Sequence, residues 1–183
     1  MIIFNPFPII ETKNLLLRRM ELKDEHDIFQ MRKDPRMNGY TDSKLDNKLE
    51  ETKSYIEKMN KGVYENKWII WGIEHKQSGK VIGSISIWNI NIEQESGELG
   101  YGIIPDYQNR GLMKEALLRV INYGFKKLKL IVLEAYTEEG NINSIKLLKG
   151  CNFSEVKRVD EEGYYSNRIY HMIVFRLENN ISK

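Results

Sequence analysis

Cysteine is almost absent from this sequence: Cys151 is the only one among 183 residues. One thiol cannot form an intramolecular disulfide, so the sequence does not belong to the small secreted proteins that disulfides hold together. Apolar runs are short, well below the roughly 20 residues that cross a bilayer. Residues 1–8 lack the charged and apolar regions of a secretory signal. We therefore expect a soluble cytoplasmic protein without a membrane partner.

An excess of one charge is missing as well. The 28 Lys and Arg residues nearly balance the 26 Asp and Glu residues, which leaves a formal net charge of +2. This balance argues against the broad basic field that nucleic-acid-binding proteins use, and we expect no DNA partner. The 3 histidines are scattered without the spacing of metal ligands, so no metal site is expected.

Two short segments nevertheless carry a local excess of glutamate. The first segment contains Glu93, Glu95 and Glu98, and the second contains Glu134, Glu138 and Glu139. If the two segments meet in space, their combined charge attracts a cation such as a protonated amine.

Apolar periodicity and turn signals divide the chain into strands and amphipathic helices. Strands are predicted at 15–18, 68–74, 80–88, 96–104, 131–136, 155–159 and 169–177. Helices are predicted from the N-cap Asp24 to Asp34-Pro35, at 46–60 with Gly62 ending it, at 111–127 and at 141–149. No linker, repeat or low-complexity run interrupts this order, so residues 1–183 are expected to form one domain. The expected fold class is α+β, a mixed, mostly antiparallel sheet of about six to seven strands flanked by about four helices.

The stretch most informative about chemistry is a strand that ends in a polar loop and enters a helix. It runs from Gly100 to Leu118, and Gly111 stands where the helix begins. Free backbone N–H groups in the first helical turn and the positive end of the helix dipole suit a pyrophosphate. The stretch contains neither the Gly-Lys-Ser/Thr of a nucleoside triphosphate loop nor the G-x-G-x-x-G of a dinucleotide fold. An ordinary strand-to-helix connection is the alternative interpretation.

This loop resembles the acetyl-CoA loop of the GNAT superfamily, Gln/Arg-x-x-Gly-x-Gly/Ala. Gln108, Arg110 and Gly111 lie where that pattern has its residues, whereas Met113 replaces the usual Gly or Ala. The resemblance implies the GNAT fold and acetyl-CoA as co-substrate. It implies cofactor binding by Ile103, Gln108, Asn109, Arg110, Gly111, Leu112, Met113 and, from a second motif, Asn141.

The second motif is similar to the Asn-x-x-Ser-x-x-Leu-Leu helix start of one GNAT branch, the RimJ and RimL type ribosomal-protein N-terminal acetyltransferases. It reads Asn141-Ile142-Asn143-Ser144-Ile145-Lys146-Leu147-Leu148. Asn152-Phe153 follows where the branch has Gly-Phe, and asparagine is the residue other than glycine that best tolerates a left-handed helix end. The likeness covers nearly the whole chain, through residues 12–19, 83–88, 98–101 and 163–177.

Amine acetylation needs a proton acceptor for the amine, an oxyanion contact and a proton for the departing thiolate. The resemblance implies that Glu98 is the general base, that Ser144 protonates the thiolate and that Asn141 contacts the pantetheine arm. The backbone amides of residues 99–102 are candidates for the oxyanion contact. The alternatives are a solvated strand carboxylate for Glu98 and helix capping for Asn141 and Ser144, as N-cap and N3 residues.

Four other side chains also have two interpretations. Trp88, Tyr101 and Tyr136 line an acceptor pocket or belong to the core, which is the commoner place for aromatic strand residues. Cys151 suggests a covalent acetyl-cysteine, but no base accompanies it, and a small buried side chain is favoured.

These features together predict an acetyl-CoA-dependent N-acetyltransferase in which a primary amine attacks the thioester directly in a ternary complex. An α-amine with a pKa of about 8 is appreciably neutral at neutral pH, unlike a lysine at about 10.4, which favours protein or peptide N-termini as acceptors. One alternative acceptor is a small amine such as a polyamine, an aminoglycoside or a peptide antibiotic. Another alternative is a non-catalytic acetyl-CoA sensor. A monomer and a homodimer both remain open.

Overall fold

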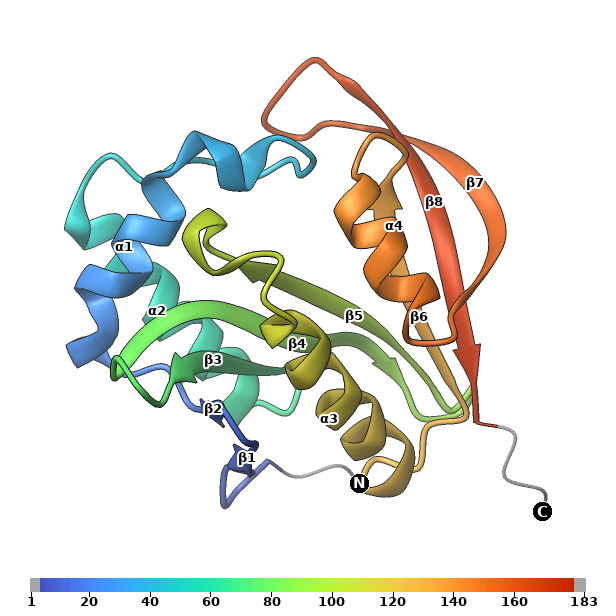
Figure 1. Cartoon of the computed structure of the whole chain (residues 1–183), viewed down its shortest axis with the longest axis horizontal. Helices are drawn as coiled ribbons and strands as arrows, with labels where there is room; N and C mark the ends of the chain where they lie inside the picture. Colours follow the sequence, from blue (N-terminus) through green and yellow to red (C-terminus); the bar gives the residue numbers. More distant parts are fainter. Residues whose placement is uncertain (1–3, 180–183) are drawn as a thin grey trace.

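The computed structural model describes residues 4–179, and residues 1–3 and 180–183 of the expected domain lie outside the described residues (Figure 1). One 8-stranded sheet, in the order β1-β2-β3-β4-β5-β6-β8-β7, forms its centre. The strands are β1 (Ile10–Glu11), β2 (Leu15–Arg18), β3 (Ile69–His75), β4 (Lys80–Asn91), β5 (Ser96–Ile103), β6 (Val132–Glu138), β7 (Ser154–Glu162) and β8 (Ile169–Glu178). The helices are α1 (Glu25–Lys33), α2 (Leu49–Tyr64), α3 (Leu112–Lys126) and α4 (Ile142–Lys149), with short 3-10 turns at Leu22–Asp24, Pro35–Asn38 and Pro105–Tyr107.

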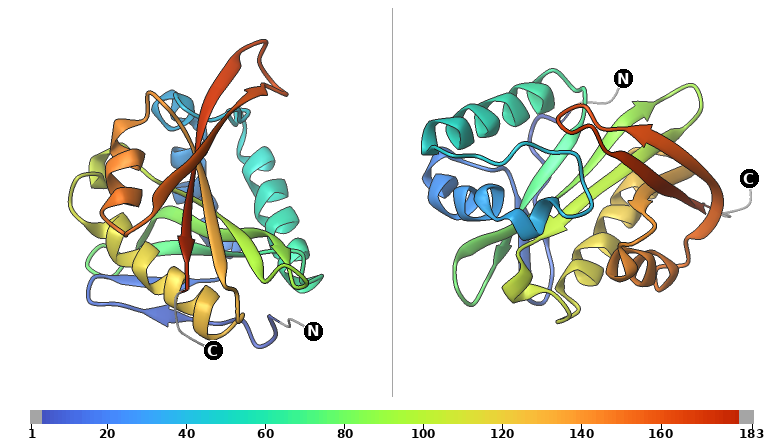
Figure 2. Two further views of the ribbon diagram at one scale, coloured as in Figure 1. Left: turned by 90° about the vertical axis from the view of Figure 1, so that its right-hand side faces the viewer. Right: turned by 90° about the horizontal axis from the view of Figure 1, so that it is seen from above.

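Helices cover the sheet on both faces. Figure 2 shows α1 and α2 against one face and α3 and α4 against the other. The central strand β3 is accordingly buried from Ile69 to Ile73, whereas no residue of the edge strand β7 is fully buried. In residues 4–179 no helix is both long and apolar enough to cross a membrane.

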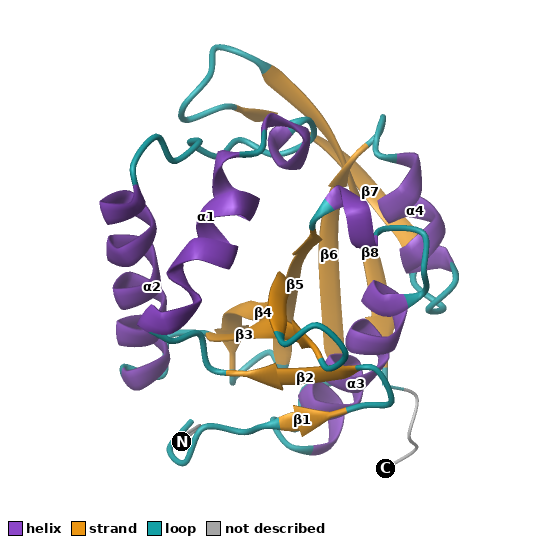
Figure 3. Ribbon diagram, turned by 60° about the vertical axis from the view of Figure 1, so that its left-hand side comes forward, coloured by secondary structure: helices purple, strands orange, loops and turns teal. Residues whose placement is uncertain are grey.

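One parallel strand pair interrupts an otherwise antiparallel sheet. Strand β5 pairs with β6 in parallel, from Ser96 opposite Val132 to Leu99 opposite Ala135, and α3 connects the two strands. Beyond Leu99 the strands separate: β6 continues to pair with β8, and the rest of β5 pairs only with β4 (Figure 3). The separation opens the sheet beside the loop between β5 and α3.

The predicted fold class and the four helices are confirmed, and the sheet has 8 strands rather than six to seven. The extra strand, β1, is only 2 residues long and pairs with β2. So short an element carries too few residues to show the period-two pattern by which strands are recognised.

One predicted helix end is wrong, and one predicted N-cap residue stands in its place without the capping hydrogen bond, each for a physical reason. Helix α2 continues past Gly62 to Tyr64, because Gly62 serves packing: a Cβ there would lie 2.0 Å from Trp68 Cζ2. Asp24 stands at the N-cap position of α1 but makes no capping hydrogen bond. Its carboxylate instead pairs with Arg18 at 2.7 Å and accepts from the Glu21 amide at 2.8 Å, which joins β2 to the start of α1.

Candidate active site

The loop that follows β5 turns sharply before α3 begins. Asn109 and Gly111 both have left-handed backbone, with φ of 57° and 77°. The Gln108 side chain donates from Nε2 to the Ile103 carbonyl at 3.0 Å and so closes the loop on the strand. A Cβ at Gly111 would meet no atom within 4 Å, so the space over this residue is open to a ligand. The first N–H groups of α3 face no helical partner and suit an anion.

A cavity of about 410 Å³ extends from this loop toward α4. It is lined by side chains from the α1–α2 connection, the end of β5, the loop and the start of α4. Arg36, Lys114 and Lys146 are among the lining residues, and no Asp or Glu of the described chain lines the cavity. Arg36 pairs with Asp34 at 2.6 Å, whereas Lys114 and Lys146 form no ion pair within residues 4–179. Two unpaired lysines favour a polyanionic ligand such as a phosphorylated cofactor.

Tyr101 and Ser144 meet in the wall of this cavity. The Tyr101 phenol oxygen lies 2.9 Å from Ser144 Oγ. The Asn141 side chain accepts from the Ser144 amide at 3.2 Å, so Asn141 caps α4 as predicted, and Ser144 is the third residue of the helix. Asn141 also lines the cavity, so capping and ligand contact are compatible at this residue.

Glu98 lies on the other face of the sheet. Because side chains alternate along a strand, Glu98 and Tyr101, three positions apart on β5, point to opposite faces. Glu98 accepts from Asn89 Nδ2 at 2.9 Å and stands opposite Glu134 on β6, one residue before the strands separate. Burial raises its pKa, the Asn89 hydrogen bond lowers it, and the negative charges of Glu161 and Glu134 raise it further.

The structure therefore brings Ser144, Asn141 and the loop together but places Glu98 outside the cavity lining. Glu98 lies just before β5 and β6 separate, and residues 101–103, just after that point on β5, line the cavity. Residues 100–103 of β5 have no partner on β6. Backbone amides of these residues that point toward β6 therefore make no hydrogen bond to that strand. This is the region in which the sequence predicts an oxyanion contact.

The remaining cofactor residues of the prediction occupy different positions. Ile103, Gln108, Asn109, Gly111, Leu112 and Met113 line the cavity. Arg110 does not, and its guanidinium lies over the Tyr107 ring at 5.3 Å from the centroid. Met113 is 9% exposed and packs into the core, while α3 runs regularly through it, so the replacement of the usual glycine does not divert the backbone.

Cys151 is a buried side chain, 3% exposed, and lies outside the cavity lining. Burial raises the pKa of its thiol, which lowers the fraction of reactive thiolate at neutral pH. This environment disfavours a covalent acetyl-cysteine.

The other two aromatic candidates lie on the Glu98 side. The Trp88 ring packs on Trp68 at 4.9 Å between centroids, and its indole nitrogen would lie 2.8 Å from a Cβ at Gly100. Trp88, on β4, is therefore a packing residue that fills the space over Gly100 of the neighbouring strand β5. Tyr136 lies two positions after Glu134 on β6 and so shares its face of the sheet. Burial and the negative charges of Glu134, Glu98 and Glu161 raise the pKa of Tyr136, and the charge of Arg176 lowers it.

The two glutamate segments meet only where Glu98 faces Glu134. Glu95 is in the turn before β5 and Glu138 at the far end of β6, about 20 Å apart at the usual strand rise. Each glutamate of the second segment also forms an ion pair with an arginine. Glu134 pairs with Arg176 at 2.7 Å, Glu138 with Arg168 at 2.9 Å and Glu139 with Arg158 at 3.3 Å.

A contact that the sequence did not predict joins the β7–β8 loop to the segment after α1. The Asp42 carboxylate accepts from the backbone amides of Tyr164 and Tyr165 and from Ser166 Oγ, the last two at 2.8 and 3.1 Å. Arg168 donates to the Gly39 carbonyl at 3.2 Å. Figure 1 shows the two segments side by side above the open end of the sheet. We call this set of contacts the Asp42 clasp.

The Asp42→Ala variant is expected to release the β7–β8 loop without unfolding the protein. Loss of the carboxylate leaves the amides of Tyr164 and Tyr165 without their acceptor, and their hydrogen exchange should accelerate about tenfold. Hydrogen–deuterium exchange mass spectrometry of the peptide that spans 162–169 measures this.

Asp34→Ala is the matched control, because within residues 4–179 the Asp34 carboxylate is bonded only to Arg36 in its own turn. It should leave exchange in 162–169 unchanged. Equal exchange in both variants and in the wild type would show that the clasp does not hold the loop.

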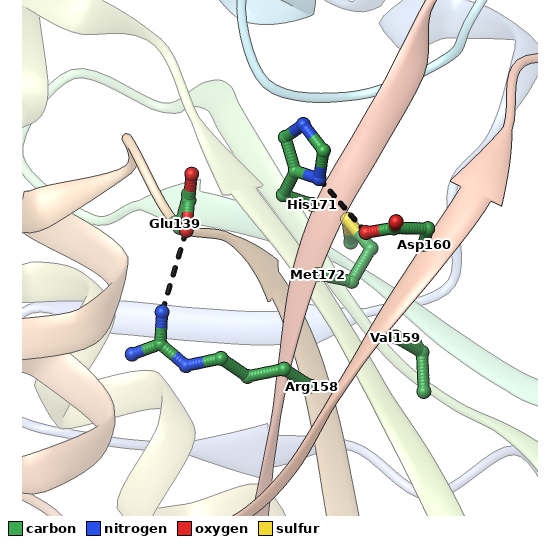
Figure 4. A pocket seen from close by; sticks show the side chains of 6 residues that line it. All are labelled: Glu139, Arg158, Val159, Asp160, His171 and Met172. Carbon is green, nitrogen blue, oxygen red and sulfur yellow. Dashed lines mark hydrogen bonds and ion pairs between the residues drawn. The ribbon is translucent and has the colours of Figure 1, made fainter.

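A second hollow, of about 200 Å³, lies on β7 and β8 (Figure 4). Its lining includes two ion pairs, Arg158 with Glu139 at 3.3 Å and His171 Nδ1 with Asp160 at 2.8 Å. The hydrogen bond and charge of Asp160 raise the pKa of His171. These exposed charges are already matched with one another, so the hollow offers no free group for catalysis. Within residues 4–179, no group of 3 or more His, Cys, Asp or Glu is placed to hold a metal ion.

A mixed sheet that opens at its parallel strand pair, beside a cationic cavity at a helix start, defines the class of acetyltransferases that use a CoA thioester. Residues 14–154 match the family model of the acetyltransferase (GNAT) domain, and the chain belongs to this family. The uncharacterized N-acetyltransferase YoaA of Bacillus subtilis is 28% identical over 171 residues, which cover 93% of this chain and 97% of YoaA.

Two solved structures show the same fold. Ribosomal-protein-S5-alanine acetyltransferase from Vibrio fischeri superposes with a TM-score of 0.83 at 21% identity, over 96% of this chain and 99% of that one. Spermidine N-acetyltransferase from Vibrio cholerae, in complex with CoA and spermine, superposes with a TM-score of 0.78 at 22% identity, over 91% and 96%. The predicted family and its likeness to ribosomal-protein acetyltransferases are confirmed.

Proposed function

We propose that this protein transfers the acetyl group of acetyl-CoA to the α-amine of a protein or peptide N-terminus, by direct attack in a ternary complex. One observation carries the proposal: a cavity that contains cationic side chains and no carboxylate is lined by Ser144, and Glu98 lies one residue before β5 and β6 separate, on the face opposite to Tyr101. The cofactor and the acceptor therefore reach the same gap from opposite sides.

The residues present fit the pyrophosphate and pantetheine of acetyl-CoA. Amides of residues 111–113 and the open space over Gly111 suit the pyrophosphate, and Lys114 and Lys146 supply charge. Gln108 and Asn109 hold the loop in shape, and Arg110 adds a charge at its rim. Asn141 is placed to contact the pantetheine arm.

Glu98 takes the proton of the attacking amine, directly or through one water. Its raised pKa makes the ionised carboxylate a stronger base than that of an ordinary glutamate. Backbone amides within residues 99–102, where β5 leaves the parallel ladder, receive the charge of the oxyanion. Ser144 gives a proton to the departing sulfur. No covalent enzyme intermediate is required, in accord with the buried Cys151 thiol.

A small polycationic amine is the second candidate acceptor. The observation that favours it is a group of carboxylates: Glu134 lies directly opposite Glu98, and the negative charges of Glu161 and Glu134 both raise the pKa of Glu98. A relative by fold is a spermidine acetyltransferase. The pairing of Glu134 with Arg176 reduces the net charge of this face, which is why we place N-termini first.

Thiol release from acetyl-CoA, with mass spectrometry of the acceptor, tests the proposal. The acceptors are N-terminal ribosomal-protein peptides, the same peptides with a blocked α-amine, spermidine and aminoglycosides. Acetylation of the free peptides alone supports the first candidate, and acetylation of spermidine supports the second. Tight acetyl-CoA binding without release on any acceptor supports a sensor. Parallel rather than intersecting double-reciprocal lines would contradict direct transfer.

The pH dependence of kcat/KM is expected to report the pKa of Glu98. The acidic limb should lie above the usual range of a glutamate, because the raised pKa leaves Glu98 protonated, and inactive as a base, to higher pH. Glu161→Gln removes a negative neighbour, which favours the ionised form of Glu98 and moves the limb to lower pH. The shift should be less than about one unit, because burial is the larger cause.

Glu162→Gln is the control, since the adjacent side chain of β7 points to the other face. Its pH profile should match that of the wild type. If the acidic limb of the pH profile did not move in Glu161→Gln, the charge of Glu161 on β7 would not affect the pKa of Glu98.

A further inference from the structure

The Tyr101 phenol is the hydrogen-bond partner of the Ser144 hydroxyl, at 2.9 Å between the two oxygens. Within residues 4–179 the Ser144 hydroxyl has no second partner. Tyr101 comes from β5 and Ser144 from the first turn of α4, and both line the cavity. The position of the Tyr101 hydroxyl is thus set by the sheet, and the position of the Ser144 hydroxyl is set by the helix.

Because Ser144 is near the start of its helix, its hydroxyl proton is not used in a hydrogen bond to a backbone carbonyl of the helix. A serine deeper in a helix usually donates to the carbonyl one turn back, as Ser54 does to Glu50 at 3.0 Å. Ser144 is the third residue of α4, and its hydroxyl makes no such bond. If Tyr101 donates to Ser144 Oγ, the Ser144 proton points to the cavity. The opposite direction would leave Ser144 no proton to give.

A serine hydroxyl alone is a poor proton source, because an aliphatic alcohol is a weaker acid than a phenol or a thiol. Burial raises the pKa of Tyr101 to about 12, while the Ser144 hydrogen bond acts in the lowering direction. The phenol is therefore fully protonated at neutral pH and available as a donor. A phenol that donates to Ser144 also polarises the Ser144 O–H bond and strengthens its own donation to a ligand.

We propose that Tyr101 and Ser144 form a proton relay for the leaving thiolate, with Tyr101 as the positioning residue that acts through Ser144. As the carbon–sulfur bond breaks and its electron pair moves to sulfur, Ser144 gives its proton to sulfur and takes the phenolic proton of Tyr101. Water restores the proton of Tyr101, and Glu98 returns the amine proton to water, so the protons balance. The relay rests on the proposed transferase function.

Hydroxyl deletions test the relay. Tyr101→Phe keeps the ring and should lower kcat about 10- to 100-fold, with acetyl-CoA Kd and acceptor KM within about twofold of wild type. Ser144→Ala should lower kcat at least as much. The double variant should be no slower than Ser144→Ala, because Tyr101 has then nothing to act through.

Tyr123→Phe is the matched control, since it removes a hydroxyl from a partly buried tyrosine that packs on Trp71 away from the cavity lining. It should retain the wild-type kcat. A wild-type kcat in Tyr101→Phe, or penalties that multiply in the double variant, would overturn the relay.

A binding measurement supplies a readout independent of turnover. The thiol of free CoA has a pKa of about 8.5 if it behaves as a cysteine thiol. A relay that donates to sulfur favours the thiolate, so the wild type should bind CoA increasingly better than desulfo-CoA as the pH is raised through this pKa. Tyr101→Phe should lose most of that gain, measured by titration calorimetry.

Equal pH responses in wild type and Tyr101→Phe would contradict the relay. Because this experiment contains no acceptor, its outcome is separate from that of the transferase assay. A wild type that acetylates no amine would refute the proposed function, whereas the CoA titrations would still decide whether Tyr101 and Ser144 donate to sulfur.

Discussion

Glu98→Gln is expected to lower kcat about 10²- to 10⁴-fold while leaving acetyl-CoA affinity within about twofold. The amide keeps the size of the side chain and can still bond Asn89, but it cannot accept a proton at neutral pH. Glu98 is not among the residues that line the cavity proposed for acetyl-CoA, so the substitution leaves that lining unchanged. Steady-state kinetics together with calorimetric titration of acetyl-CoA measures both quantities.

The control for this prediction is Glu134→Gln, directly opposite Glu98 on β6. It makes the same chemical change one strand away and should lower kcat by less than about fivefold, since Glu134 is engaged with Arg176. The acidic limb of the pH profile should disappear in Glu98→Gln and persist in Glu134→Gln. Unchanged turnover and pH dependence in Glu98→Gln would show that another group is the base.

Gly111→Val is expected to raise the Kd of acetyl-CoA about 10- to 100-fold. The residue has φ of 77°, and its open side faces the cavity that the prediction assigns to the pyrophosphate. A branched side chain would fill that space and separate the helix amides from the phosphates. The loss of one hydrogen bond to a charged group, about 1.5 to 3 kcal/mol, corresponds to this range.

Gly79→Val separates the loss of binding from backbone strain. Gly79, in the β3–β4 turn, also has left-handed backbone, φ of 66°, and also has no atom within 4 Å of a Cβ. Both variants should lose about 1 to 2 kcal/mol of unfolding free energy in a denaturant titration. Only Gly111→Val should lose acetyl-CoA affinity. Equal loss of affinity in both would mean that destabilisation, rather than the loop, explains the effect.

The strands and helices whose ends are marked by neighbouring residues were predictable from the sequence. The β3–β4 hairpin follows from two β-branched runs around a turn that needs the left-handed backbone of Gly79. The start of α4 follows from Asn141, whose side chain caps the helix, and its end follows from the left-handed Asn152, φ of 67°. In each case the determining contact lies within a few residues of chain.

Two local predictions failed because a side chain outside the helix, six positions away along the chain, decided the feature. Gly62 looks like a helix end in the sequence, but it makes room for the Trp68 ring. Asp24 has the type and position of a capping residue, but Arg18 takes its carboxylate. Both residues have two physical uses, and only the partner present in the folded protein selects between them.

The sequence by itself determined the family and the position of the loop from Gln108 to Gly111, because both depend on short motifs with a fixed local geometry. It also supplied Glu98, Asn141 and Ser144 as predicted site residues. The tertiary structure alone decided that Glu98 and Ser144 reach the opening from opposite faces and that Tyr101 stands behind Ser144 across 43 residues of chain. It also decided the Asp42 clasp, which joins residues 124 positions apart. Such contacts depend on how the sheet is assembled, and the strand order that brings them together is not encoded in the spacing of neighbouring residues.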